Sequence, residues 1–106
     1  MTRFENLKEL LEKRNELDWD SWIYCNVEQW NKTPNNTVFY HVSENEALEY
    51  DEDSETRNPM FCVEMNIQPF LEFETFNDII EVSRSKDVQI VIKAINYYRE
   101  YDTFLE

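Results

Sequence analysis

The spacing of hydrophobic residues divides the chain into a helical beginning, a strand-rich middle and a helical end. Near the N-terminus apolar side chains recur at three- and four-residue steps, the spacing of one face of a helix. These positions are Phe4, Leu7, Leu10, Leu11 and Leu17. Thr2 and Glu5 have the spacing of a capping box, so a helix is predicted to start at Thr2 and to end before the turn-forming residues 18–21 (DWDS).

The middle of the chain predicts strands. Residues 22–26 (WIYCN) are rich in aromatic and β-branched side chains, and Trp22 and Tyr24 are expected in the core. Residues 37–42 (TVFYHV) follow a predicted turn at 33–36 (TPNN), where two asparagines tolerate the left-handed conformation that glycine usually supplies. Residues 61–67 (FCVEMNI) alternate apolar and polar positions and predict the clearest half-buried strand. Pro69 should end that strand or place it at an edge.

Two further helices are predicted at the C-terminal end. Thr75 and Asp78 resemble a capping pair at the start of the first. A polar break at residues 83–86 (SRSK) leads to the second, which Asp87 opens. Its apolar positions repeat at helical steps and are Val88, Val91, Ile92, Ile95 and Tyr98.

This order of elements predicts an α+β fold. An antiparallel sheet of about three to four strands would carry the N-terminal helix and the two C-terminal helices packed on one face. No repeat or linker divides the chain, and 106 residues suffice for one modest core. Residues 1–106 are therefore expected to form a single acidic domain.

Composition narrows the function classes. The chain has 23 Asp and Glu against 10 Lys and Arg, a net charge of −13, and no glycine. The lack of glycine excludes the phosphate-binding loops that need it for close backbone approach. Cys25, Cys62 and His41 are too few for a four-ligand zinc site of Cys and His alone. We therefore expect no cofactor and no resident metal.

The charge also bears on partners and location. Direct binding to nucleic acid or to an anionic membrane requires clusters of Lys and Arg, which this acidic chain lacks. No run approaches the ~20 apolar residues of a membrane span, and the N-terminus has no apolar signal region. A cytoplasmic protein is expected, in which both cysteines are free thiols packed as small apolar side chains.

The charge is concentrated in one part of the chain. Residues 1–17 and residues 82–106 each hold four acidic and four basic side chains, so residues 18–81, with 15 acidic residues against Lys32 and Arg57, carry the whole excess. The densest part is residues 44–55, here called the acidic segment, which has no basic residue. It is either a solvated loop that aids solubility or a surface matched to a strongly basic partner.

We favour the basic partner because aromatic side chains lie in and near the acidic segment and would supply anchors that charge alone does not. Trp30, between Gln29 and Asn31, is expected to be exposed. The predicted partner-binding residues are Glu44, Glu46, Glu49, Tyr50, Asp51, Glu52, Asp53, Glu55 and Trp30.

Catalytic and metal chemistry finds little support. A calcium-binding EF-hand loop starting at Asp51 would need Gly and Glu where the chain has Thr56 and Cys62. His41 lies inside a predicted strand and is expected to be a structural or surface residue. A Cys–His nucleophilic pair lacks the orienting group and oxyanion donors that it needs. We predict no catalytic residues and no enzyme activity.

Three stretches carry a resemblance to a known family. They are residues 17–24 (LDWDSWIY), 76–81 (FNDIIE) and 94–104 (AINYYREYDTF). With them the chain resembles small acidic bacterial immunity proteins of toxin–immunity systems, including those of contact-dependent growth inhibition. The resemblance implies a cytoplasmic antitoxin that binds a nuclease toxin domain and has no catalytic residues of its own.

Resemblance and charge together predict a monomer that binds a cationic toxin one-to-one, the expected toxin being a ribonuclease or another nuclease. A nuclease must present Lys and Arg to phosphates, so an acidic protein can occupy the same field and block substrate entry. The alternative is a DNA mimic of the anti-restriction or anti-CRISPR type, which would spread its carboxylates in rows that imitate phosphates. A metal-dependent or thiol enzyme is the third class, and we do not expect it.

Overall fold

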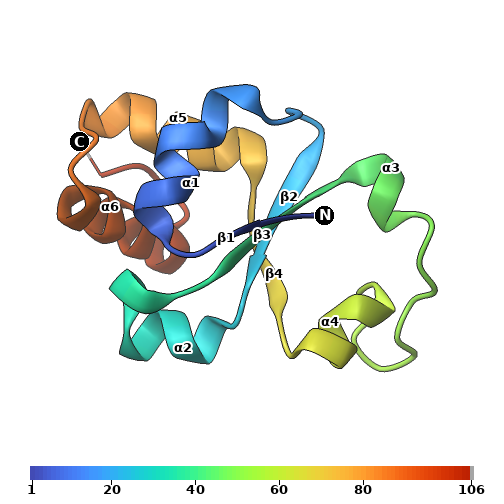
Figure 1. Ribbon diagram of the computed structural model, residues 1–106. Coiled ribbons are helices and arrows are strands. Elements are labelled where there is room, and N and C mark those ends of the chain that lie inside the picture. The colour runs from blue at the N-terminus through green and yellow to red at the C-terminus, as the bar shows by residue number, and fades with distance from the viewer. Residues whose placement is uncertain (106) are drawn as a thin grey trace.

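A computed structural model describes residues 1–105 as one four-stranded antiparallel sheet with helices on both faces (Figure 1). The elements in chain order are β1 (Thr2–Phe4), α1 (Leu7–Lys13), the 3-10 helix η1 (Arg14–Glu16), β2 (Ser21–Cys25), α2 (Val27–Lys32), the 3-10 helix η2 (Pro34–Asn36), β3 (Phe39–Ser43), α3 (Glu44–Ala47), α4 (Met60–Met65), β4 (Gln68–Glu72), α5 (Phe73–Ser83) and α6 (Val88–Tyr101). The predicted α+β class is confirmed, with an N-terminal helix and two C-terminal helices on a sheet of four strands.

The sheet has the order β1-β3-β2-β4, and all its neighbours are antiparallel. Phe39 of β3 pairs with Phe4 on one side and with Cys25 on the other, so the three side chains share a face. The β2–β4 register shifts between Ile23 and Tyr24. Because side chains alternate along each strand, the two central strands β2 and β3 contribute to two different cores.

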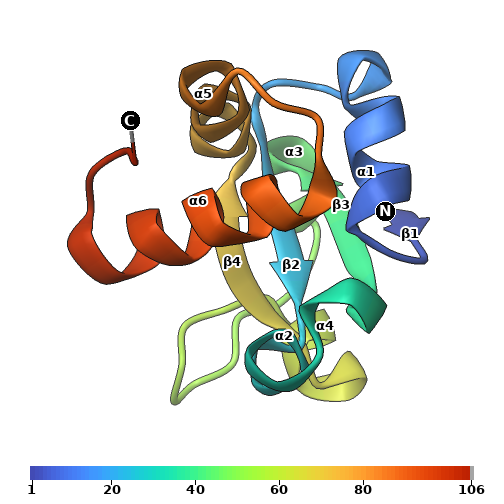
Figure 2. The same cartoon turned by 90° about the vertical axis from the view of Figure 1, so that its left-hand side faces the viewer.

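The larger core lies between the sheet and the helices α1, α2, α5 and α6, which Figure 2 shows in front of the strands. Its buried side chains are Phe4, Leu7, Leu10, Ile23, Cys25, Trp30, Phe39, Phe70, Leu71, Phe73, Phe76, Ile79, Ile80, Val91, Ile92, Ala94 and Ile95. The helical periodicity of the C-terminal residues predicted this buried face of α5 and α6.

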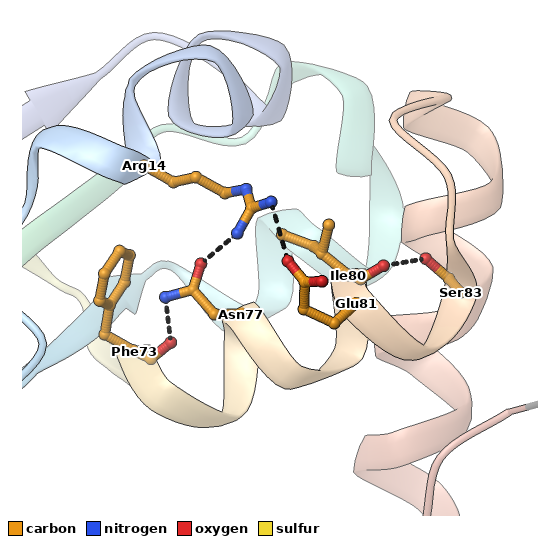
Figure 3. A network of polar contacts seen from close by, with 6 residues as sticks. All are labelled: Arg14, Phe73, Asn77, Ile80, Glu81 and Ser83. Atoms are coloured by element: carbon orange, nitrogen blue, oxygen red, sulfur yellow. Dashed lines mark hydrogen bonds and ion pairs between the residues drawn. The ribbon is translucent and has the colours of Figure 1, made fainter.

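A polar network fastens η1 to α5 across the edge of this core (Figure 3). A guanidinium N–H of Arg14 donates to the Oδ1 atom of the buried Asn77 at 2.7 Å. The Asn77 amide in turn donates to the Phe73 carbonyl one helical turn earlier, at 3.1 Å. A second guanidinium N–H lies 3.5 Å from the carboxylate of Glu81. The network satisfies a buried amide that would otherwise be costly.

The smaller core lies on the opposite face of the sheet, under α3 and α4 (Figure 1). Its buried members are Tyr24, Val42, Phe61, Cys62 and Ile67. Cys25 and Cys62 therefore pack in different cores, and both are free and buried, as predicted.

The predicted strand at residues 61–67 is wrong. Residues 60–65 form the helix α4, in which the adjacent side chains Phe61 and Cys62 are buried while Val63 and Met65 are exposed. Asn66 ends this helix in the left-handed conformation, with φ at 53°. The strand follows as β4, where Pro69 lies on an edge strand, one of the two places predicted for it.

The predicted start of the first helix is also wrong. Residues 2–4 form β1 and pair with β3, so Thr2 and Glu5 make no capping box. The helix begins at Leu7, and the Oδ1 atom of Asn6 caps it by accepting from the backbone N–H of Glu9 at 2.9 Å. Pairing of β1 with the edge of β3 outweighs the local helix signal of residues 2–5.

The chain makes its left-handed positions without glycine, although not where predicted. Asn35 and Asn36 belong to a 3-10 helix, whereas the positive φ angles occur at Arg57, Asn66, Arg84 and Asp102. Arg84 and Asp102 end α5 and α6, a position usually taken by glycine. α5 begins at Phe73, before the predicted capping pair, and Asp87 caps α6 as predicted.

Candidate functional site

The acidic segment forms α3 and the loop that leads to α4, and it lies on the outer side of the smaller core (Figure 1). Ser43 caps the start of α3, and its hydroxyl accepts from the backbone N–H of Glu46 at 3.2 Å. The backbone N–H of Glu44 donates to the Asp20 carbonyl at 2.8 Å. This bond holds the start of the acidic segment beside residues 18–20, which precede β2.

Four of the predicted carboxylates are exposed and have no side-chain hydrogen bond or ion pair within residues 1–105. They are Glu44, Glu49, Asp51 and Glu55. Their charges are not compensated by a neighbouring base, so they are available to a partner.

The other three predicted carboxylates stabilise the segment itself. Glu46 binds the N-terminal ammonium group, and Glu52 lies 3.3 Å from the Nε atom of Arg57. Asp53 accepts from both the backbone N–H and the hydroxyl of Thr56, each at 2.9 Å. These hydrogen bonds lower the pKa of Asp53 below its ordinary value.

Tyr50, a predicted partner-binding residue, is only partly exposed. Its side chain is 41% exposed, and its ring meets Phe61 edge-on with 5.0 Å between the centroids. Phe61 in turn meets Tyr24 edge-on at the same distance. Tyr50 therefore joins the acidic segment to the smaller core while keeping one side open.

The predicted exposure of Trp30 is wrong. Its side chain is 1% exposed, and its indole N–H donates to the Oδ1 atom of Asn96 at 2.8 Å. The ring also meets Phe39 and Phe70 edge-on. Because Trp30 lies on the short helix α2, its polar neighbours in sequence point about 100° away from it and toward water. Trp30 is a core residue and not part of the partner-binding surface.

The sequence interpretation missed two acidic residues next to the segment. A pocket of about 350 Å³ is lined by Asp18, Trp19, Asp20, Ser43, Glu44 and Asn45. A smaller one of about 190 Å³ shares Asp18 and Ser43 with it. Trp19 is 61% exposed between the two aspartates, and this alternation of acidic and aromatic residues was the available signal. We call Asp18, Asp20 and the acidic segment together the acidic surface.

A groove adjoins the acidic surface where α3 meets the sheet. It has a volume of about 270 Å³, and its lining residues are Trp22, Tyr24, Val42, Glu44, Ala47, Leu48, Tyr50, Glu52, Arg57 and Pro59. Tyr24 is buried as predicted, but Trp22 is 38% exposed and the core position predicted for it is wrong. Trp22 alternates with the inward-facing Ile23 and so points to the open side of the sheet.

His41 and the two cysteines are held in unreactive states. Burial lowers the pKa of His41 below its ordinary value of 6.5, although its Nε2–H lies 3.2 Å from the Asp18 carbonyl, which favours the charged form. Burial raises the pKa of Cys25 to about 12 and that of Cys62 to about 11. Neither thiol is therefore a ready nucleophile at neutral pH.

Within residues 1–105 no three His, Cys, Asp or Glu side chains are grouped so that they could hold a metal ion. None of the helices described is long and apolar enough to cross a membrane.

Comparison with known proteins gives the family of the chain. No curated protein and no solved structure matches it. A family model, described as a domain of unknown function (DUF7716), matches residues 4–106, which is nearly the whole chain. The protein therefore belongs to the DUF7716 family.

Proposed function

We propose that the protein is an immunity protein that binds and neutralises a cationic nuclease toxin domain, with a ribonuclease as the expected class. The observation that carries this proposal is the set of uncompensated carboxylates on the acidic surface. Glu44, Glu49, Asp51 and Glu55 are exposed and make no ion pair within residues 1–105, and Asp18 and Asp20 lie beside Glu44.

Concentrated charge of one sign is costly for the fold. Like charges repel one another locally, and a net charge of −13 opposes the compact state. A basic partner removes that repulsion when it binds. The field would also speed the encounter with such a partner and discriminate against acidic surfaces.

Neutralisation would follow from occupancy. A nuclease binds the phosphates of its substrate through Lys and Arg, and counterions compete for the same positions. An acidic surface docked there excludes the nucleic acid without any chemistry on the inhibitor. We expect the complex to form one-to-one in the cytoplasm, without direct binding of this protein to nucleic acid or membrane.

The fixed carboxylates support a specific protein contact more than mimicry of DNA. Glu46, Glu52 and Asp53 are engaged with the N-terminus, Arg57 and Thr56. The remaining carboxylates of the acidic segment are open to a partner, and exposed apolar side chains lie between them in the sequence. A surface that replaces a DNA strand would need its carboxylates free and regularly spaced.

The test is inhibition of the basic nuclease domain encoded by the reading frame next to this one. That domain is purified alone, and its cleavage of labelled RNA and DNA is titrated with this protein. We expect cleavage to stop at one equivalent and the two proteins to elute as a one-to-one complex. Full cleavage at a tenfold excess would overturn the proposal, as would a neighbouring frame without a basic domain. Inhibition of a DNA-binding enzyme instead would establish the mimic.

A further inference from the structure

We infer that the groove beside α3 receives one apolar side chain of a basic partner segment, flanked on that segment by Lys or Arg. This inference rests on the proposed function, because it names the chemistry by which the same surface selects its partner. It assigns an anchoring role to Trp22 and Leu48, which face the groove together with Tyr50.

Three exposed apolar side chains, Trp22, Leu48 and Tyr50, line this groove together. Leu48 is 77% exposed and follows the last residue of α3, while Trp22 and Tyr50 are open by about two fifths. The fold does not require a leucine there, because Leu48 contributes its backbone N–H to the Glu44 carbonyl at 3.1 Å and any residue could do so. Contiguous exposed apolar side chains with a polar rim are typical of a protein-binding surface.

The walls of the groove are held in place before a partner arrives. Tyr50 packs edge-on against Phe61, and Phe61 packs edge-on against Tyr24, with 5.0 Å between centroids in each pair. The backbone N–H of Tyr50 donates to the Ala47 carbonyl at 3.2 Å. A site whose walls are already ordered loses less conformational entropy on binding.

The size of the groove favours a side chain over a small molecule. The groove has a volume of about 270 Å³, at the small end of the range of about 300–1,000 Å³ typical of ligand pockets, and it is open to solvent, so it would enclose little of a drug-sized ligand. Its lining combines apolar side chains with two carboxylates and one guanidinium. A leucine, methionine or phenylalanine from a protein surface fits that description.

Charge determines what flanks the apolar side chain. Glu44 and Glu52 lie at the rim, and the one base there, Arg57, is already paired with Glu52. The uncompensated charge of Glu44 and of the neighbouring Glu49 and Asp51 therefore favours Lys or Arg on the partner. A second copy of this chain is disfavoured as occupant, because each copy carries a net charge of −13.

The experiment uses the whole ¹⁵N-labelled protein and two synthetic peptides of equal charge. One peptide is Lys-Arg-Leu-Phe-Arg-Lys, and the other replaces its two apolar residues by serine. The indole N–H signals of Trp19, Trp22 and Trp30 are followed by NMR. We expect the apolar peptide to shift the Trp22 signal saturably, the serine peptide to bind at least about fivefold more weakly, and the buried Trp30 signal to stay fixed.

A matched pair of variants connects the shift to the groove. Leu48→Ser should weaken binding of the apolar peptide about tenfold. Ile90→Ser removes an exposed side chain of α6 and should leave the affinity unchanged. Urea unfolding of both variants shows that each is folded.

The outcomes separate this inference from the proposed function. Equal affinity for the two peptides, or a shift confined to Trp19, overturns the groove assignment even if the protein inhibits a nuclease. A saturable Trp22 shift that needs Leu48 supports the assignment even if the neighbouring nuclease is not inhibited.

Discussion

The indole N–H of Trp30 donates to the Oδ1 atom of Asn96 at 2.8 Å and so joins α2 to α6 across the larger core. The two residues are 66 positions apart in the chain. Trp30 also meets Phe39 and Phe70, so one side chain connects two strands and two helices. A tryptophan in a polar stretch of sequence is thus part of the framework that supports the sheet.

Substitution of Trp30 should therefore lower stability. Trp30→Phe keeps an aromatic ring but loses the hydrogen bond and should cost about 1 kcal/mol. Trp30→Ala also leaves a cavity and should cost about 3–5 kcal/mol. Urea unfolding measures both. Unchanged stability and weakened partner binding in Trp30→Ala would show instead that Trp30 is exposed, as the sequence predicted.

Arg14 should stabilise the fold more through its hydrogen bond to the buried amide of Asn77 than through its ion pair with Glu81. Arg14→Met removes the donor to the Asn77 Oδ1 atom, which is buried, and should cost about 1–3 kcal/mol. Glu81→Gln weakens only a pair whose carboxylate is exposed, and it should cost less than about 1 kcal/mol. Equal losses in urea unfolding for the two variants would show that the amide contact contributes nothing.

His41 should make stability depend on pH. Burial lowers the pKa of His41 in the folded state below the value of about 6.5 expected in the unfolded chain. At pH values between these two pKa values, the unfolded chain binds more protons than the folded one. Stability contributed by neutral His41 is present above pH 6.5 and is lost as the pH falls through the folded pKa. His41→Gln lacks the titrating group, so the wild type should lose stability relative to it from pH 7.5 to 5.0. Parallel curves from urea unfolding would contradict this.

The two cysteines should resist modification in the folded state. Burial keeps the pKa of Cys25 at about 12 and that of Cys62 at about 11, so the thiolate is rare at pH 8. We expect an aromatic disulfide reagent to react only as the protein unfolds in urea, with both thiols released together. Rapid reaction of one thiol in native buffer would mean that its core opens locally.

The spacing of apolar residues correctly predicted elements in which that spacing repeats over several helical turns or strand positions. Asp87 caps α6, the apolar face of α5 and α6 is buried, and Tyr24 lies in the smaller core. Short elements were not predictable in the same way. Residues 61–67 alternate like a strand, but in the structure residues 60–65 form the helix α4 and the strand β4 begins only after Asn66. Alternation over so few residues does not distinguish the two.

The sequence predicted where the negative charge of the candidate site is concentrated. It did not predict which residues distant in sequence lie next to that charge. The acidic segment stands out in the sequence, and Glu44, Glu49, Asp51 and Glu55 are exposed. The contribution of Asp18 and Asp20 depends on a backbone hydrogen bond between Asp20 and Glu44, residues that are far apart in the sequence. The groove at Leu48 likewise exists only because α3 packs over the second face of the sheet.

If the acidic surface attracts a cationic nuclease, its charge should control the association rate constant. The site variant reverses Asp20, Glu49 and Asp51 to Lys, because their side chains make no hydrogen bond within residues 1–105. The control variant reverses the exposed Glu12, Asp78 and Glu100 to Lys. These residues lie on α1, α5 and α6, which cover the larger core, and the net charge changes by the same amount.

Stopped-flow mixing with the neighbouring nuclease domain is carried out over a series of salt concentrations. We predict that the site variant associates at least about tenfold more slowly than the control variant at low salt, and that the difference shrinks as salt screens the field. Equal rate constants for the two variants at every salt concentration would mean that the acidic surface does not attract the nuclease.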